Sequence, residues 1–159
     1  SINFFNNEWG AHYLTSLEIY KDYPVLGAGI KGFRHQCGKK KYDNIKSLAS
    51  FKRCSSHPHN IYLEILSETG TVGFVLFIIF IYVLLFKSLK VIKNSEKFLI
   101  SKTDKHNYVV FLSLFAMFVS LIWPIRSSGS FFSNFNGSML WYNFSLLSFY
   151  TNFFLMKIK

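Results

Sequence analysis

The stretch GTVGFVLFIIFIYVLLF, residues 70–86, decides the fold, because it runs for 17 residues without a charged side chain. Two more charge-free stretches follow, residues 107–125 and 127–156. About 17–25 apolar helical residues cross the roughly 30 Å hydrocarbon core of a bilayer. Three such stretches among 159 residues exclude an ordinary soluble enzyme, a disordered tail and a nucleic-acid module. The sequence predicts an all-α, polytopic membrane helical bundle with three transmembrane helices and a large external loop.

The net charge of +10 predicts an orientation in the membrane rather than a nucleic-acid partner, since no basic stripe with interleaved aromatic residues is present. Six lysines lie between Lys87 and Lys105, and short lysine-rich loops stay in the cytoplasm. We therefore expect membrane lipids as partners and aromatic residues at the membrane interfaces, namely Trp9, Trp123, Trp141 and Tyr142. The predicted order is an extracytoplasmic loop with short helices (1–68), a transmembrane helix (69–92), a cytoplasmic loop (93–106), a transmembrane helix (107–125), an external loop (126–137) and a transmembrane helix (138–156).

The beginning of the chain suggests a missing upstream part. The sequence starts at Ser1, without a methionine or a signal-peptide pattern. Export of a 68-residue loop requires an upstream signal or membrane span. We therefore expect this chain to be the C-terminal part of a longer polytopic protein.

The only two cysteines, Cys37 and Cys54, both fall in the predicted external loop. Cysteine pairs in an oxidising compartment usually form a disulfide, and closing a 17-residue loop would stabilise the fold by roughly 3 kcal/mol. A zinc site that adds His57 and His59 is the alternative, but its spacing matches no common closed site. We expect the disulfide and no metal.

The external loop contains two predicted helices. Residues 12–23 form the first, which Pro24 ends, and a glycine-rich segment follows at residues 27–34. The second begins near Pro58 and leads into the first membrane span, with Gly70 as a stop or hinge. Asn60, Glu64, Ser67 and Glu68 share one face of this second helix.

His59 opens this helix at the predicted membrane boundary. A histidine there suits acid–base chemistry because its side chain titrates near neutral pH. The alternative is a structural histidine that caps the helix or bonds a carbonyl group. Glu64 or Glu68 would orient the imidazole, or both would simply be solvated carboxylates.

The string His57-Pro-His59-Asn60-x-Tyr-Leu-x-x-Leu-x-Glu68-x-Gly70-x-x-Gly resembles the signature of the O-antigen ligase and polymerase superfamily. The preceding Gly27-x-Gly-x-x-x-Phe33 resembles a second segment of that family, and the cysteine pair resembles one found in one of its branches. The resemblance covers residues 12–80 well and the two later spans only by topology.

The resemblance implies a glycosyltransferase of the GT-C type in the bacterial inner membrane, with residues 1–68 facing the periplasm and no cofactor. Its donor would be a polyprenyl-diphosphate-linked glycan, and its acceptor lipid A–core, another glycan or a protein hydroxyl. His59 matches the family histidine and is the catalytic candidate. The arginine that the family commonly has upstream of the glycines has no counterpart here. Candidate substrate-binding residues for the diphosphate or glycan are Arg34, Arg126, His57, Asn60, Glu64 and Glu68.

Other functions share these motifs. An O-antigen polymerase and a protein O-oligosaccharyltransferase would carry the same signature as a ligase. A non-catalytic membrane subunit of polysaccharide assembly would bind the lipid-linked glycan without turning it over. The sequence leaves these alternatives open.

Overall fold

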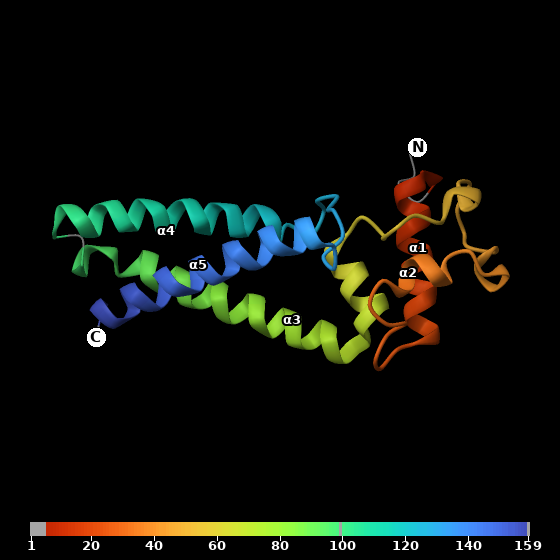
Figure 1. The fold of residues 1–159 in the computed structure, drawn as a ribbon, viewed down its shortest axis with the longest axis horizontal. Coiled ribbons are helices and arrows are strands. Elements are labelled where there is room, and N and C mark those ends of the chain that lie inside the picture. The colour runs from red at the N-terminus through yellow and green to blue at the C-terminus, as the bar shows by residue number, and fades with distance from the viewer. Residues whose placement is uncertain (1–5, 99, 159) are drawn as a thin grey trace. The chain divides into compact units, whose positions relative to one another are not determined.

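The structure, a computed structural model, describes residues 6–98 and 100–158, and within them it is helical without strands. The chain divides into two compact units, one made of residues up to Phe77 together with Pro124–Gly137 and one made of Ile78–Trp123 with Ser138–Lys159. The elements are α1 (Glu8–Asp22), α2 (Gly32–Gln36), η2 (Lys40–Tyr42), η3 (Ser50–Lys52), α3 (Ile61–Lys93), η4 (Ser95–Lys97), α4 (Lys102–Leu121) and α5 (Asn134–Ile158) (Figure 1).

Helix α1 begins earlier than the predicted residue 12, because Asn7 caps it. The Asn7 side-chain oxygen accepts a hydrogen bond from the Gly10 backbone N–H at 2.8 Å, which satisfies one of the free donors of the first turn. The helix ends at Asp22, just before Pro24. Its buried face includes Ile19, which belongs to a small core with Phe33, Cys37 and Tyr42.

A disulfide closes this core. Cys37 and Cys54 are bonded, with their Cα atoms 5.2 Å apart. The Tyr42 hydroxyl also donates to Asp22 at 2.6 Å, which ties the intervening loop to α1. The disulfide uses both of the thiols that the four-ligand zinc alternative would need as ligands.

The glycine-rich segment lies directly against the kink in α3. Gly70 interrupts α3 with φ 66°, a left-handed conformation that glycine adopts without steric cost. The Ala28 N–H donates to the Ser67 carbonyl at 2.9 Å, and the Thr71 N–H donates to the Pro24 carbonyl at 2.8 Å. A Cβ atom on Gly70 would overlap the Val25 carbonyl group. Gly70, predicted as a stop or hinge, is therefore the kink that admits this contact.

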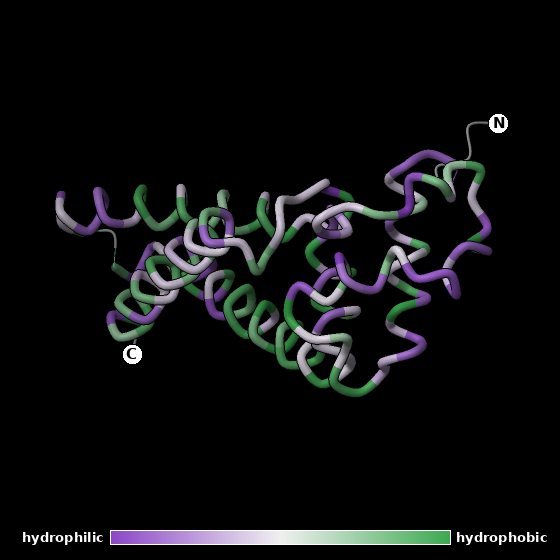
Figure 2. Tube along the Cα trace, turned by 45° about the vertical axis from the view of Figure 1, so that its right-hand side comes forward, coloured by the Kyte–Doolittle hydropathy of each residue, from purple (hydrophilic) through white to green (hydrophobic). Residues whose placement is uncertain are grey.

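One helix of the described residues, α3, is long and apolar enough to cross a membrane. Only 22% of its most apolar window is buried in the structure, unlike the core helix of a soluble protein, and Figure 2 shows hydrophobic residues along much of this helix. The second and third predicted spans lie largely within α4 and α5. Helix α4 begins with charged residues and α5 contains many polar residues, so both helices are less hydrophobic than α3. The three-span arrangement is thus not confirmed and stays a prediction.

Aromatic residues and a few polar bonds hold the second unit together. The rings of Phe98 and Phe154 stack at 4.6 Å, and those of Phe118 and Phe144 meet edge to face at 5.6 Å. Buried Ser88 of α3 bonds Thr151 of α5 through their hydroxyls at 3.1 Å. Polar contacts of this kind are common between helices in membranes.

We expect Gly70→Ala to detach the glycine-rich segment from α3. The substitution combines an unfavourable positive φ with an overlap, and we expect it to destabilise the first unit by about 2 kcal/mol or more. Hydrogen exchange of residues 24–33 in the solubilised protein measures the effect. Gly38→Ala is the matched control, because its Cβ would meet nothing closer than 3.9 Å. Unchanged protection in Gly70→Ala would contradict the role of the kink.

Candidate functional site

Three histidines of the first unit gather beside one tryptophan. His12 comes from α1, whereas His57 and His59 lie in the segment that precedes α3. The His59 ring centre lies 4.1 Å from that of His57 and 5.3 Å from that of His12. The Trp9 indole meets His59 edge-on at 4.7 Å. His59 is therefore the common neighbour of the other three rings.

His59 has a left-handed backbone, with φ 59°. Residues other than glycine adopt this conformation uncommonly, although histidine does so more often than most, and Lys31 shares it here. The Ser128 N–H donates to the His59 carbonyl at 2.9 Å, which holds the residue from the second loop. Backbone strain of this kind persists only where the surroundings impose it, and it concentrates at functional sites.

Asn60, the residue after His59, connects the start of α3 to the second loop. Its side-chain oxygen accepts hydrogen bonds from the N–H groups of Tyr62 and Leu63 at 3.0 and 3.2 Å, so it caps α3. Its amide nitrogen donates to the Pro124 carbonyl at 2.8 Å. Asn60, a predicted substrate-binding residue, thus uses both ends of its side chain to join α3 to the segment 124–133.

His57 is held in a defined orientation. Its Nε2 lies 3.2 Å from the Ser128 carbonyl oxygen, and because a carbonyl only accepts, this nitrogen carries the proton. Its Nδ1 then accepts from the Ser56 hydroxyl at 2.8 Å. Both ring nitrogens of His57 therefore have hydrogen-bond partners, and the ring packs against that of His59.

The surroundings keep His59 uncharged. Burial, followed by the nearby His57 and His12, lowers the pKa of His59 to about 4. Burial also lowers the pKa of His12. A neutral imidazole has one nitrogen free to accept a proton or a hydrogen bond. In addition, the buried Nδ1 of His12 has no hydrogen-bond partner among the described residues.

The polar face of α3 is buried rather than solvated. Glu64 and Glu68 are each only 1% exposed, and Asn60 and Ser67 on the same face are buried too. The interpretation of the two carboxylates as solvated is therefore wrong. Because burying a carboxylate is costly unless it is hydrogen-bonded, each of them needs donors from another part of the chain.

Each carboxylate clamps one loop. Glu68 accepts from the backbone N–H groups of Lys31 at 2.5 Å and Phe33 at 3.2 Å. Glu64 accepts from the Ser130 hydroxyl at 2.5 Å and the Phe131 N–H at 2.8 Å. The two carboxylates thus hold the glycine-rich segment and the segment 124–133. Their hydrogen bonds go to these loops, not to the imidazole of His59.

Arg34 and Arg126, the candidates for binding diphosphate, lie on these two clamped loops. Arg34 follows Phe33 in α2, and Arg126 lies between Pro124 and Ser128. Both side chains are exposed. The structure therefore attaches one exposed guanidinium group to each loop that Glu68 and Glu64 hold.

The sequence did not predict that Trp9 and His12 lie beside His59. Trp9, for which the sequence predicts a place at a membrane interface, packs against His59 in the structure. His12 lies three residues further along the same helix, and this i, i+3 spacing puts both on one face. The spacing therefore indicates that Trp9 and His12 lie side by side, but nothing in the sequence predicts that this face of α1 contacts residues 57–59.

Comparison with known proteins supports the family resemblance. Residues 10–78 match the family model described as O-antigen ligase. The matched range contains the glycine-rich segment, the disulfide, the three clustered histidines and the kink of α3. Trp9 lies just before it. No curated protein and no solved structure matches the chain. The resemblance drawn from the motifs is confirmed over this range.

We expect the two clamps to be separable. Glu68→Ala should expose the amide protons of Lys31 and Phe33 to exchange, and Glu64→Ala should expose that of Phe131, because each change leaves buried donors without an acceptor. Residue-resolved hydrogen exchange measures both effects. Equal loss of protection in both loops for either variant would contradict separate clamps.

We expect the neutral state of His59 to persist in mild acid. Diethyl pyrocarbonate reacts with the neutral imidazole, so the modification rate of His59 should stay constant from pH 7 to about pH 5. With a pKa of about 4, it should halve only near pH 4. Mass spectrometry of the peptide that contains His59 follows the reaction. A midpoint near 6.5 would contradict the lowered pKa.

Proposed function

We propose that this chain, which carries an O-antigen ligase family match, is part of a membrane glycosyltransferase. In this proposal it transfers a glycan from a polyprenyl diphosphate carrier to an acceptor hydroxyl, in the manner of an O-antigen ligase. Lipid A–core is the proposed acceptor. The protein lies in the bacterial inner membrane, and residues 1–68 face the periplasm. The family match over residues 10–78 and the apolar helix α3 support this assignment.

The proposed reaction forms a bond between the acceptor oxygen and the anomeric carbon while the bond from that carbon to the diphosphate oxygen breaks. His59, neutral at physiological pH, accepts a hydrogen bond from the acceptor hydroxyl and orients it. The hydroxyl becomes acidic as the new bond forms, and its proton passes to the imidazole and then to water. The low pKa of about 4 keeps the imidazole ready to accept but makes it a weak base, so proton transfer is late.

The leaving diphosphate requires positive charge. Guanidinium groups bind phosphate oxygens in a bidentate manner, and such groups can stabilise a developing anion electrostatically. We assign this role to Arg34 and Arg126. The Glu68 and Glu64 clamps support the assignment, because they fix the loops that carry the two arginines.

The observation that carries the proposal is the strained, neutral His59 inside the matched range. A non-catalytic subunit would need a glycan-binding surface but no histidine held in a costly conformation. Polymerase and protein O-oligosaccharyltransferase activities use the same chemistry with another acceptor. The surface glycans of a deletion strain separate them: loss of all capped lipid A–core indicates a ligase, single-repeat caps a polymerase, and bare glycoprotein the third activity.

We expect His59→Ala in the full-length protein to lower transfer at least 100-fold, since a positioned acid–base group contributes about 10²–10⁴. Transfer is measured with lipid-linked glycan and acceptor in reconstituted membranes. His35→Ala, which removes an exposed histidine of α2, should retain activity and serves as the control. Full activity of His59→Ala, with normal insertion, would remove His59 from the mechanism.

A further inference from the structure

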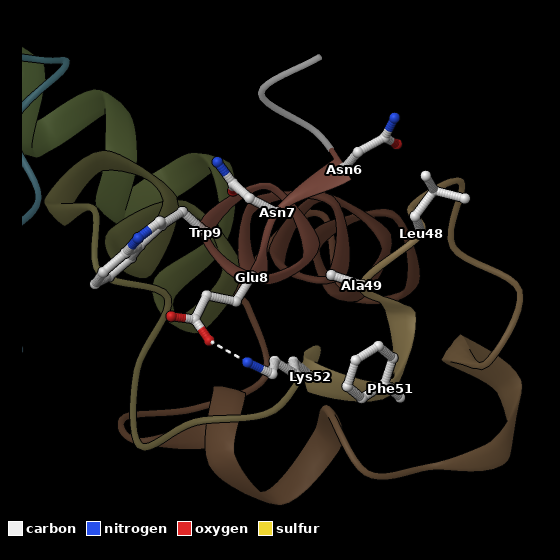
Figure 3. Close-up of a pocket in the computed structure, with 8 residues that line it drawn as sticks. All are labelled: Asn6, Asn7, Glu8, Trp9, Leu48, Ala49, Phe51 and Lys52. Atoms are coloured by element: carbon white, nitrogen blue, oxygen red, sulfur yellow. Dashed lines mark hydrogen bonds and ion pairs between the residues drawn. The ribbon is translucent and has the colours of Figure 1, made fainter. Parts of the chain in front are cut away.

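A pocket beside the histidine cluster has no role in the chemistry described above. It measures about 480 Å³, within the range of about 300–1,000 Å³ in which proteins bind small molecules. It lies between the start of α1 and the 3₁₀ helix η3 (Figure 3). Its lining residues are Asn6, Asn7, Glu8, Trp9, Leu48, Ala49, Phe51 and Lys52.

The pocket is lined by two aromatic rings and by an ion pair, which we call its polar floor. Phe51 is 77% exposed and Trp9 is 36% exposed, and they flank the ion pair of Glu8 and Lys52 in the view of Figure 3. That pair is 3.2 Å long and leaves the floor without net charge. The Asn7 oxygen caps α1, and the same side chain carries an amide N–H₂ group that can donate hydrogen bonds.

This combination fits a sugar ring. A pyranose presents apolar C–H faces, which pack on aromatic rings, and an equator of hydroxyl groups, which bond carboxylate, ammonium and amide groups. An anionic phosphate would favour an excess of positive charge, which the Glu8–Lys52 pair does not provide. A purely apolar ligand would leave the ion pair and the amides desolvated at a cost.

The pocket is connected to the proposed catalytic residue through one side chain. Trp9 lines the pocket, and the same indole meets the His59 ring at 4.7 Å. A group bound against Trp9 thus contacts a side chain that also contacts the proposed catalytic imidazole. This shared contact suits a sugar that neighbours the reacting one in a glycan chain.

We propose that the pocket formed by Trp9, Phe51 and the Glu8–Lys52 pair binds a neutral pyranose of the donor or acceptor glycan, adjacent to the sugar that reacts at His59. This inference rests on the proposed glycan-transfer function and adds a binding subsite to it. It assigns Trp9 two contacts, one with the bound sugar and one with His59.

The test uses the full-length protein and the oligosaccharide repeat released by mild acid from the host's own surface polysaccharide. Calorimetric titration should show binding that weakens at least tenfold in Phe51→Ala. Leu26→Ala, which truncates another exposed apolar residue outside the pocket (73% exposed), should bind like the original protein. In the transfer assay, Phe51→Ala should raise KM for one glycan substrate about tenfold with little change in kcat, and the affected substrate identifies the donor or the acceptor as the occupant.

The outcomes separate this inference from the proposed function. Equal binding by the original protein and Phe51→Ala, or an equal loss in Leu26→Ala, would overturn the subsite even if His59→Ala abolishes transfer. Absence of transfer by the original protein, together with oligosaccharide binding that depends on Phe51, would overturn the transferase and retain the sugar site. Labelling of Phe51 by a photoreactive phospholipid, with no oligosaccharide binding, would assign the pocket to lipid and overturn the inference.

Discussion

The burial of two carboxylates within one turn of α3 is the constraint on which the first unit depends. Glu64 and Glu68 are almost completely excluded from solvent, and a buried carboxylate without donors would cost several kcal/mol. Their donors come from two loops that are distant in sequence. Each loop therefore supplies the donors for one buried carboxylate, and residues 60–72 of the chain contact both residues 24–33 and residues 124–133. The glycines at 27 and 70 make this possible by letting the backbones approach closely.

The position of His59 follows from the same assembly. The residue immediately precedes the cap of α3, and Ser128 on the Glu64-clamped loop holds its carbonyl. Asn60 bonds that loop as well. Partial burial and the neighbouring His57 and His12 lower the pKa of the His59 imidazole. Strain, burial and neutrality of His59 are thus consequences of loop docking rather than of local sequence, which explains how an unfavourable backbone conformation is maintained there.

The sequence predicted the helical class, the helix before Pro24, the special role of Gly70 and the shared face of Asn60, Glu64 and Glu68, because these depend on local periodicity and on turn residues. It did not predict that this face is buried. Carboxylates are nearly always solvated, and only contacts with residues 31–33 and 130–131 reverse that expectation. For the same reason Trp9 and His12 could not be placed beside His59, since their proximity arises from packing between distant segments. The sequence also predicted three spans, of which only α3 has the required apolar character among the described helices.

The spacing of the two clamps has a further consequence. Glu64 and Glu68 are four residues apart, so about 6 Å of rigid helix separates the anchor of one loop from that of the other. The distance between the two anchored loops is therefore set by the geometry of the helix and not by the loops themselves. One residue inserted between the two glutamates would rotate one of them by about 100° around the helix axis and move it away from the loop that it holds.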